Sequence, residues 1–169
     1  DMKAIVYTSN TGTTEEYAKL LADATSLPCY ELGKGKASLA KGDDVIFLGW
    51  LMAGTIKGYK DAAKYFHIAA VCAVGMGQTG SQHDEVTKKN HIPQGTPLFT
   101  LQGGFDISKL HGVYKMMMNT MAKTAGKSLA KKTDRTPEED DMLDMMVHGG
   151  SRVDQKHLQG VLDWYKTVK

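Results

Sequence analysis

The sequence predicts an α/β fold of three layers, in which a doubly wound, five-stranded parallel sheet carries helices on both faces. Short apolar runs of strand length alternate with stretches in which apolar residues recur at i, i+3, i+4 and i+7. The 169 residues are 41% hydrophobic and 24% charged, which matches one core of ordinary globular composition. We therefore predict a single domain over 1–169, with a helical C-terminal extension over 105–169.

The strands are predicted from apolar runs that lie between turn-forming residues. In chain order they are 3–7, 28–32, 45–49, 68–74 and 97–102. The helical period appears between them at 17–24, 59–66 and 83–90, whereas the glycine- and lysine-rich segment 33–42 is expected to hold at most one helical turn. Alternating strands and helices imply parallel strands with right-handed crossovers, so a ligand is expected beyond the carboxyl ends of the strands.

After Gly103-Gly104 the pattern is helical to the end of the chain. The first of these helices has one apolar stripe, and it is expected to stop at Gly126. The stripe residues are Leu110, Val113, Tyr114, Met117 and Met121. We interpret the methionines between 116 and 121 as core packing, with a soft surface for a quinone or a protein partner as the alternative.

Two more helices are predicted behind it. Thr136 as N-cap and Pro137 at the first helical position open one of them, which ends at Gly149 and Gly150. The last one follows from the spacing of its apolar residues, which are Leu158, Val161, Leu162 and Tyr165.

Charge is close to balanced over the whole chain but uneven along it. A formal net charge of +2 and a pI near 8.4 provide no field for nucleic-acid binding, which we do not expect. Between 105 and 135, seven basic residues face two acidic ones, and an acidic run follows at 138–144. We interpret these blocks as two solvated helix faces. The alternative is that the basic helix 108–132 makes peripheral contact with an anionic membrane or an acidic partner.

Cysteine usage and hydropathy bear on the compartment. Cys29 and Cys72 provide neither a disulfide framework nor a metal framework, and Cys72 lies in an apolar run where a buried thiol is expected. We recognise no signal peptide at the start of the sequence, and no stretch is apolar enough for a membrane span. A cytoplasmic location is predicted.

The turn after the first strand has the chemistry of a phosphate site. Four hydroxyl side chains in six residues stand directly before a helix, where unpaired backbone N–H groups and the helix dipole favour an anion. The six residues are Thr8, Ser9, Asn10, Thr11, Gly12 and Thr13. They contain no lysine or arginine and match neither nucleoside-triphosphate nor dinucleotide motifs, so we expect one terminal phosphate held by uncharged donors.

Two further segments, both predicted to be loops, follow neighbouring strands and should share this sheet edge. One places an aromatic and large apolar side chains where a planar ring would be sandwiched, and its residues are Trp50, Leu51, Met52, Ala53, Gly54 and Thr55. The other is glycine-rich and offers backbone amides to a ring edge, and its residues are Gly75, Met76, Gly77, Gln78, Thr79 and Gly80. Phosphate, flat ring and polar ring edge together indicate flavin mononucleotide (FMN).

The stretch from Lys3 to Leu21, with its Thr-Ser-Asn-Thr-Gly-Thr turn, resembles the phosphate loop of the flavodoxin family, and residues 3–104 follow that family's plan. The resemblance implies the strand order 2-1-3-4-5 and FMN as cofactor, with the three segments contacting its phosphate and its isoalloxazine ring. The tail, which begins Gly103-Gly104-Phe105-Asp106-Ile107-Ser108-Lys109-Leu110, is similar to the flavodoxin-domain subgroup that includes the quinone-dependent protoporphyrinogen oxidases of bacteria.

The favoured hypothesis is an FMN-binding redox protein, an oxidoreductase or electron donor for a redox partner protein or a quinone-like small molecule. No catalytic acid–base residue is required, because the flavin carries the redox chemistry. One alternative is a flavoenzyme that oxidises a porphyrin-like or hydroquinone substrate under the helices after Phe105. The other is a noncatalytic binding module that kept the fold without the flavin.

Overall fold

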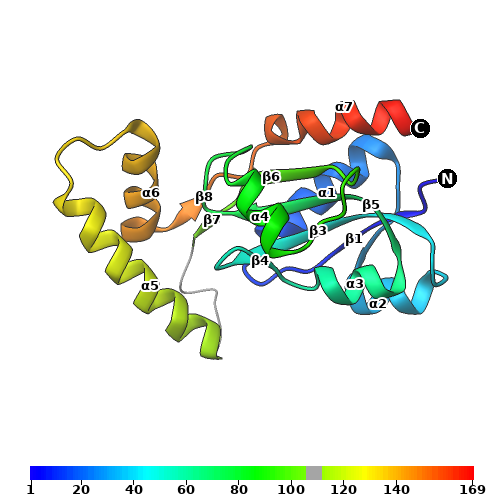
Figure 1. Cartoon of the computed structure of the whole chain (residues 1–169), viewed down its shortest axis with the longest axis horizontal. Helices are drawn as coiled ribbons and strands as arrows, with labels where there is room; N and C mark the ends of the chain where they lie inside the picture. The colour runs from blue at the N-terminus through cyan, green and yellow to red at the C-terminus, as the bar shows by residue number, and fades with distance from the viewer. Residues whose placement is uncertain (106–111) are drawn as a thin grey trace.

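The computed structural model of the chain, which describes residues 1–105 and 112–169, has the predicted three-layer α/β architecture (Figure 1). Its central sheet contains five parallel strands in the order β2-β1-β3-β5-β6, which is the predicted order 2-1-3-4-5. These strands are β1 (Ala4–Tyr7), β2 (Cys29–Glu31), β3 (Asp44–Met52), β5 (His67–Gly75) and β6 (Leu98–Gln102).

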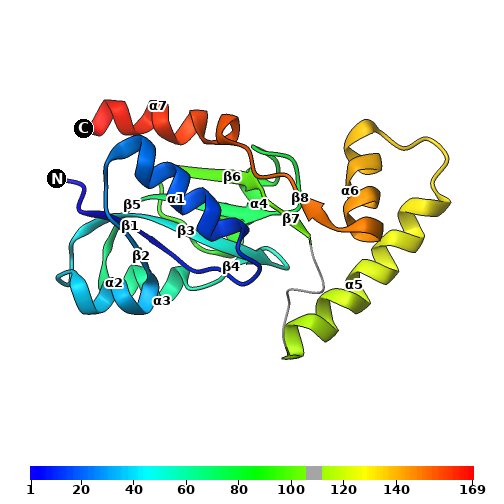
Figure 2. The same ribbon diagram turned by 180° about the vertical axis from the view of Figure 1, so that it is seen from behind.

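Helices cover both faces of the sheet, as Figures 1 and 2 show from opposite sides. Helices α1 (Thr13–Thr25) and α7 (Gln159–Val168), with the short 3₁₀ helix η2 (Gln155–Leu158), lie on one face. Helices α2 (Leu32–Ser38), α3 (Tyr59–Tyr65) and α4 (His83–Lys89) lie on the other. Side chains alternate along each strand, so β3 sends Val45 and Phe47 to one core and Ile46 and Leu48 to the other.

Two local predictions in this part were wrong. Residues 33–42 were expected to hold at most one helical turn, but α2 has seven residues, because Glu31 caps its start by accepting from the Gly33 N–H at 3.1 Å. Residues 50–55 were expected to form a loop, but β3 continues to Met52 and returns as the short antiparallel strand β4 (Thr55–Ile56). Ala53 and Gly54 form this turn with positive φ angles of 50° and 82°, which a tight hairpin turn requires.

The C-terminal part is a helical hairpin of α5 (Gly112–Lys131) and α6 (Pro137–His148), which stands beyond the carboxyl ends of the sheet strands (Figures 1 and 2). The predicted start of α6 is confirmed, because Thr136 and Glu139 form a complete capping box around Pro137. Between this helical hairpin and the sheet, strands β7 (Gly104–Phe105) and β8 (Gly150–Ser151) pair antiparallel, so the expectation of helices alone after Gly103-Gly104 was wrong.

The predicted end of the first hairpin helix was also wrong. Helix α5 runs through Gly126 to Lys131, and Gly126 does not have the positive φ angle of a helix-terminating glycine. Good helix formers follow it, and they outweigh the cost of about 1 kcal/mol for one glycine in a helix. Residues 108–111 of the predicted basic helix, with Leu110 of the predicted stripe, lie outside the described residues.

Candidate functional site

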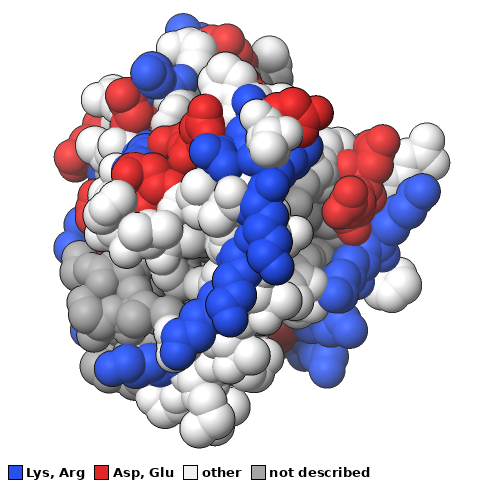
Figure 3. Space-filling view, turned by 90° about the vertical axis from the view of Figure 1, so that its left-hand side faces the viewer, with Lys and Arg blue, Asp and Glu red and all other residues white. Residues whose placement is uncertain are grey.

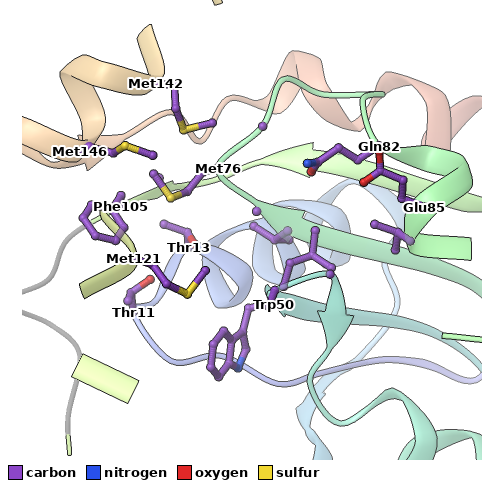
Figure 4. A pocket seen from close by; sticks show the side chains of 18 of the residues that line it. Thr11, Thr13, Trp50, Met76, Gln82, Glu85, Phe105, Met121, Met142 and Met146 are labelled. Carbon is purple, nitrogen blue, oxygen red and sulfur yellow. The ribbon is translucent and has the colours of Figure 1, made fainter. Parts of the chain in front are cut away.

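A cavity of about 470 Å³ lies beyond the carboxyl ends of β1, β3 and β5, where a ligand was expected (Figure 4). All three predicted segments contribute to its lining. From the first come Thr11 and Thr13, and from the second and third come Trp50, Leu51, Ala53, Gly54, Gly75, Met76 and Gly77. Its volume lies within the range of pockets that bind cofactors and other small molecules.

The first segment is shaped by its own side chains as much as by the strand before it. The Thr8 hydroxyl donates to the Lys57 carbonyl at 2.6 Å, and the Ser9 hydroxyl accepts from the Gly12 N–H at 3.2 Å. Gly12 adopts φ 98°, which turns the chain into α1. Thr8 and Ser9 therefore stabilise the turn, and among the hydroxyls of the segment those of Thr11 and Thr13 stand at the cavity.

Two polar atoms at this turn are buried without a hydrogen-bond partner among the described residues, namely Asn10 Nδ2 and Thr14 Oγ1. Thr14 is fully buried in the first turn of α1, whose N-cap residue, Gly12, has no side chain to cap the helix. The Ser9 hydroxyl accepts from the Glu15 N–H of that turn at 3.4 Å. A buried donor without a partner costs about 1–3 kcal/mol, so most native structures avoid one. Two of them beside a helix N-terminus are the pattern that a bound anion would satisfy.

The second segment forms the hairpin of β3 and β4, and α4 holds it in place. Asn90, buried at the end of α4, accepts from the Ile56 N–H at 2.9 Å and donates to the Gly54 carbonyl at 2.8 Å. Lys89 Nζ donates to the Ala53 carbonyl. The Trp50 ring lies 6.0 Å from Lys57 Nζ, a cation–π distance. The hairpin directs Leu51 to the cavity, and the cavity lining does not include Met52 and Thr55.

The third segment divides at its middle. Gly75, Met76 and Gly77 line the cavity, and a Cβ at Gly75 would come within 2.9 Å of Leu51 Cδ1, so a side chain there would collide with the hairpin. The other half is bound to β6. The Gly80 N–H donates to the Thr100 carbonyl at 3.0 Å, and Thr79 Oγ1 accepts from the Gln102 N–H at 3.0 Å. The lining of the main cavity therefore includes neither Thr79, Gly80 nor Gln78.

Sequence reasoning missed two parts of the lining. Helix α4 contributes side chains from one face, and the α5–α6 hairpin together with β7 closes the cavity from outside. The residues at α4 are Glu85, Val86 and Lys89 of the helix and Gln82, which directly precedes it. Those on the outer side are Phe105 of β7, Met121 of α5, and Met142 and Met146 of α6. The methionines gather near Thr11 and Thr13, while Gln82 and Glu85 lie at the opposite end (Figure 4). The prediction that methionines 116 to 121 pack in the core was wrong for Met116, Met117 and Met121, which are 72%, 43% and 44% exposed.

A network of polar side chains joins the α5–α6 hairpin to the sheet. Arg152 donates to Asp141 and to Asp144, both at 2.9 Å, and the Gln102 side chain donates to Asp141 at 3.0 Å and to the Met76 carbonyl at 3.2 Å. The bond to Asp141 raises the pKa of Arg152. This network places α6 over the glycine-rich segment.

A second polar contact lies behind the site. The Tyr17 hydroxyl donates to the Gln102 carbonyl, and its distance to His157 Nδ1 is 2.7 Å. Burial raises the pKa of Tyr17 to about 12, so the hydroxyl stays protonated and keeps this bond at neutral pH.

The part of the chain that the structure describes contains no group of three or more His, Cys, Asp or Glu side chains that could hold a metal ion. None of its helices is long and apolar enough to cross a membrane. In comparisons with known proteins, no family model and no curated protein matches the chain.

Proposed function

We propose that the protein binds FMN in this cavity and acts as a redox protein, which exchanges electrons with a partner protein or a quinone-like small molecule. The observation that carries the proposal is the pair of buried, unpartnered atoms at the start of α1, Asn10 Nδ2 and Thr14 Oγ1. Both atoms are hydrogen-bond donors of uncharged side chains. A single phosphate can accept hydrogen bonds from them without a lysine or arginine beside it.

The rest of the cavity fits the remainder of the cofactor. Leu51, Val86 and Met76 provide apolar surface against which a flat ring packs. Gly75 and Gly77 leave the backbone bare, so their segment can approach a ring edge closely. When bound, FMN supplies the electron-transfer chemistry. The protein would hold the phosphate, orient the ring and keep water from it with the methionines of α5 and α6.

A comparison of FMN with riboflavin tests the proposal, because the two differ only in the phosphate. The purified chain is mixed with each compound and desalted, and the visible absorbance that stays with the protein is measured. We expect FMN to be retained more strongly than riboflavin. A chain that retains neither compound would be a noncatalytic module of this fold, and equal retention would place the phosphate outside the turn.

A second candidate function is a flavoenzyme that oxidises a porphyrin-like or hydroquinone substrate. It is favoured by a groove of about 600 Å³ between α5 and α6, which shares Phe105 and Met146 with the main cavity. A substrate in that groove would lie against the wall of the proposed cofactor site. Oxidation of a hydroquinone by the FMN-loaded protein, without any protein partner, would favour this candidate over an electron carrier.

The proposed location is the cytoplasm. Cys29 and Cys72 are both free thiols, as is usual in a reducing compartment. The buried Cys72 thiol has its pKa raised to about 12 by burial, so it is unreactive and has no part in the proposed chemistry.

A further inference from the structure

Helix α5 carries charge of one sign. Its 20 residues, Gly112–Lys131, include four lysines and no aspartate or glutamate. Figure 3, which faces the hairpin, shows basic side chains in a row across this end of the molecule. A cationic helix at the edge of a molecule attracts anionic surfaces over distances of about 10 Å at moderate salt.

The same helix exposes large apolar side chains. Val113 is 70% exposed, Met116 72% and Met117 43%, and all three lie in the first two turns. At 100° per residue, these three side chains lie on the same side of α5 as Lys123, Lys127 and Lys131, which follow toward its end. We call this side the lysine–methionine face, made of Val113, Met116, Met117, Lys123, Lys127 and Lys131.

The lysines of this face are not neutralised by the acidic helix beside them. Four of the five carboxylates of α6 are bound elsewhere, and of these Glu139 pairs with Lys132 at 2.9 Å and Asp140 pairs with Arg135 at 2.7 Å. Asp141 and Asp144 pair with Arg152. Within residues 1–105 and 112–169, Lys123, Lys127 and Lys131 form no ion pair, so their charge is available to a partner.

We propose that the lysine–methionine face docks on the surface of an anionic lipid bilayer. Lysines beside exposed apolar side chains are the composition of helices that lie in the membrane interface, where the apolar groups enter the acyl boundary and the ammonium groups meet lipid phosphates. This inference does not depend on the proposed cofactor.

An acidic protein is the less favoured partner for three reasons. Arginine, whose planar group pairs with carboxylates in a bidentate manner, is absent from α5, and lysine is depleted at the centres of protein interfaces. The hairpin also stands clear of the sheet and its helices in Figures 1 and 2, so a flat surface reaches the outer side of α5 without meeting the body.

Vesicle sedimentation tests the proposal, with phosphatidylcholine vesicles compared with vesicles that also contain phosphatidylserine. We expect the full chain to bind only the anionic vesicles, and binding to weaken as salt is raised. Each lysine near an anionic surface strengthens binding about fivefold, so the triple variant Lys123→Gln, Lys127→Gln, Lys131→Gln should bind roughly a hundredfold more weakly. The double variant Val113→Ser, Met116→Ser should lose the part of the binding that resists salt.

The matched control is Lys34→Gln, Lys41→Gln, Lys60→Gln, which removes the same charge from exposed lysines in and between α2 and α3. This variant should bind as the wild type does. Failure of the wild type to bind anionic vesicles, or equal weakening by the two triple variants, would overturn the proposal. Binding to soluble polyglutamate as strong as to vesicles, unaffected by Val113→Ser and Met116→Ser, would show an acidic protein to be the partner instead. Circular dichroism of each variant verifies that it is folded.

Discussion

The substitution Thr14→Val separates a ligand-binding role of the Thr14 hydroxyl from a structural one. The two roles predict changes of opposite sign in the stability of the ligand-free protein. Thr14 is fully buried and its Oγ1 has no partner among the described residues. Valine has the same shape without the hydroxyl, so the ligand-free variant no longer buries an unsatisfied donor. Since such a donor costs about 1–3 kcal/mol, we expect a stabilisation of about 1–2 kcal/mol. In a domain of this size this raises the unfolding midpoint by about 2–8 °C.

The same substitution should weaken FMN binding. A hydrogen bond to a charged phosphate contributes about 1.5–3 kcal/mol, so its loss should raise the dissociation constant about 10- to 100-fold. The assays are thermal unfolding without ligand and fluorescence titration with FMN and riboflavin. Riboflavin affinity should change much less than FMN affinity.

The control for this experiment is Thr25→Val in the same helix. The Thr25 hydroxyl donates to the Leu21 carbonyl at 2.7 Å, far along α1 from the turn. This variant should be slightly less stable than the wild type and bind FMN equally well. A Thr14→Val variant that melts lower and retains full FMN affinity would refute the reasoning, because the hydroxyl would then have a partner within the protein and no contact with a phosphate.

Three other predictions concern the framework of the site. Gly126→Ala should raise the unfolding free energy by about 0.5–1 kcal/mol, since a Cβ there meets nothing within 4 Å and α5 is continuous; a lower melting temperature would indicate a helix break at this glycine. Thr136→Ala should cost about 1 kcal/mol and Thr136→Ser much less, because serine retains the capping box; equal melting of the two would contradict the cap. Burial raises the pKa of Tyr17 from 10.0 to about 12, so this residue's contribution to stability is complete below pH 10 and is lost as pH rises toward 12. Tyr17→Phe should therefore show a shallower alkaline decline in urea unfolding, and a decline parallel to that of the wild type would count against this origin.

The candidate site shows where local sequence patterns stop being informative. The turn at Thr11 and Thr13 was recognisable because strand, hydroxyl-rich turn and helix are consecutive in the chain. The sequence did not show which of these hydroxyls face the cavity. The Thr8 hydroxyl, for example, is bound to the Lys57 carbonyl, a contact that spans 49 positions of the chain. Another contact between residues distant in the chain is made by Asn90, which holds the β3–β4 hairpin that was predicted to be a loop.

Periodicity alone determined the alternation of strands and helices, and with it the parallel sheet and the edge where the cavity lies, because those features follow from local apolar patterns and the handedness of crossovers. The strand order was predicted from the resemblance of residues 3–104 to the flavodoxin family. Only the tertiary structure decided which surfaces the methionines cover. Met121 and Met145 both have helical spacing, yet Met145 is fully buried while Met121 is 44% exposed at the cavity. The direction of the α5–α6 hairpin makes this difference, and contacts between residues distant in the chain, such as Arg152 with Asp141 and Gln102 with Asp141, set that direction.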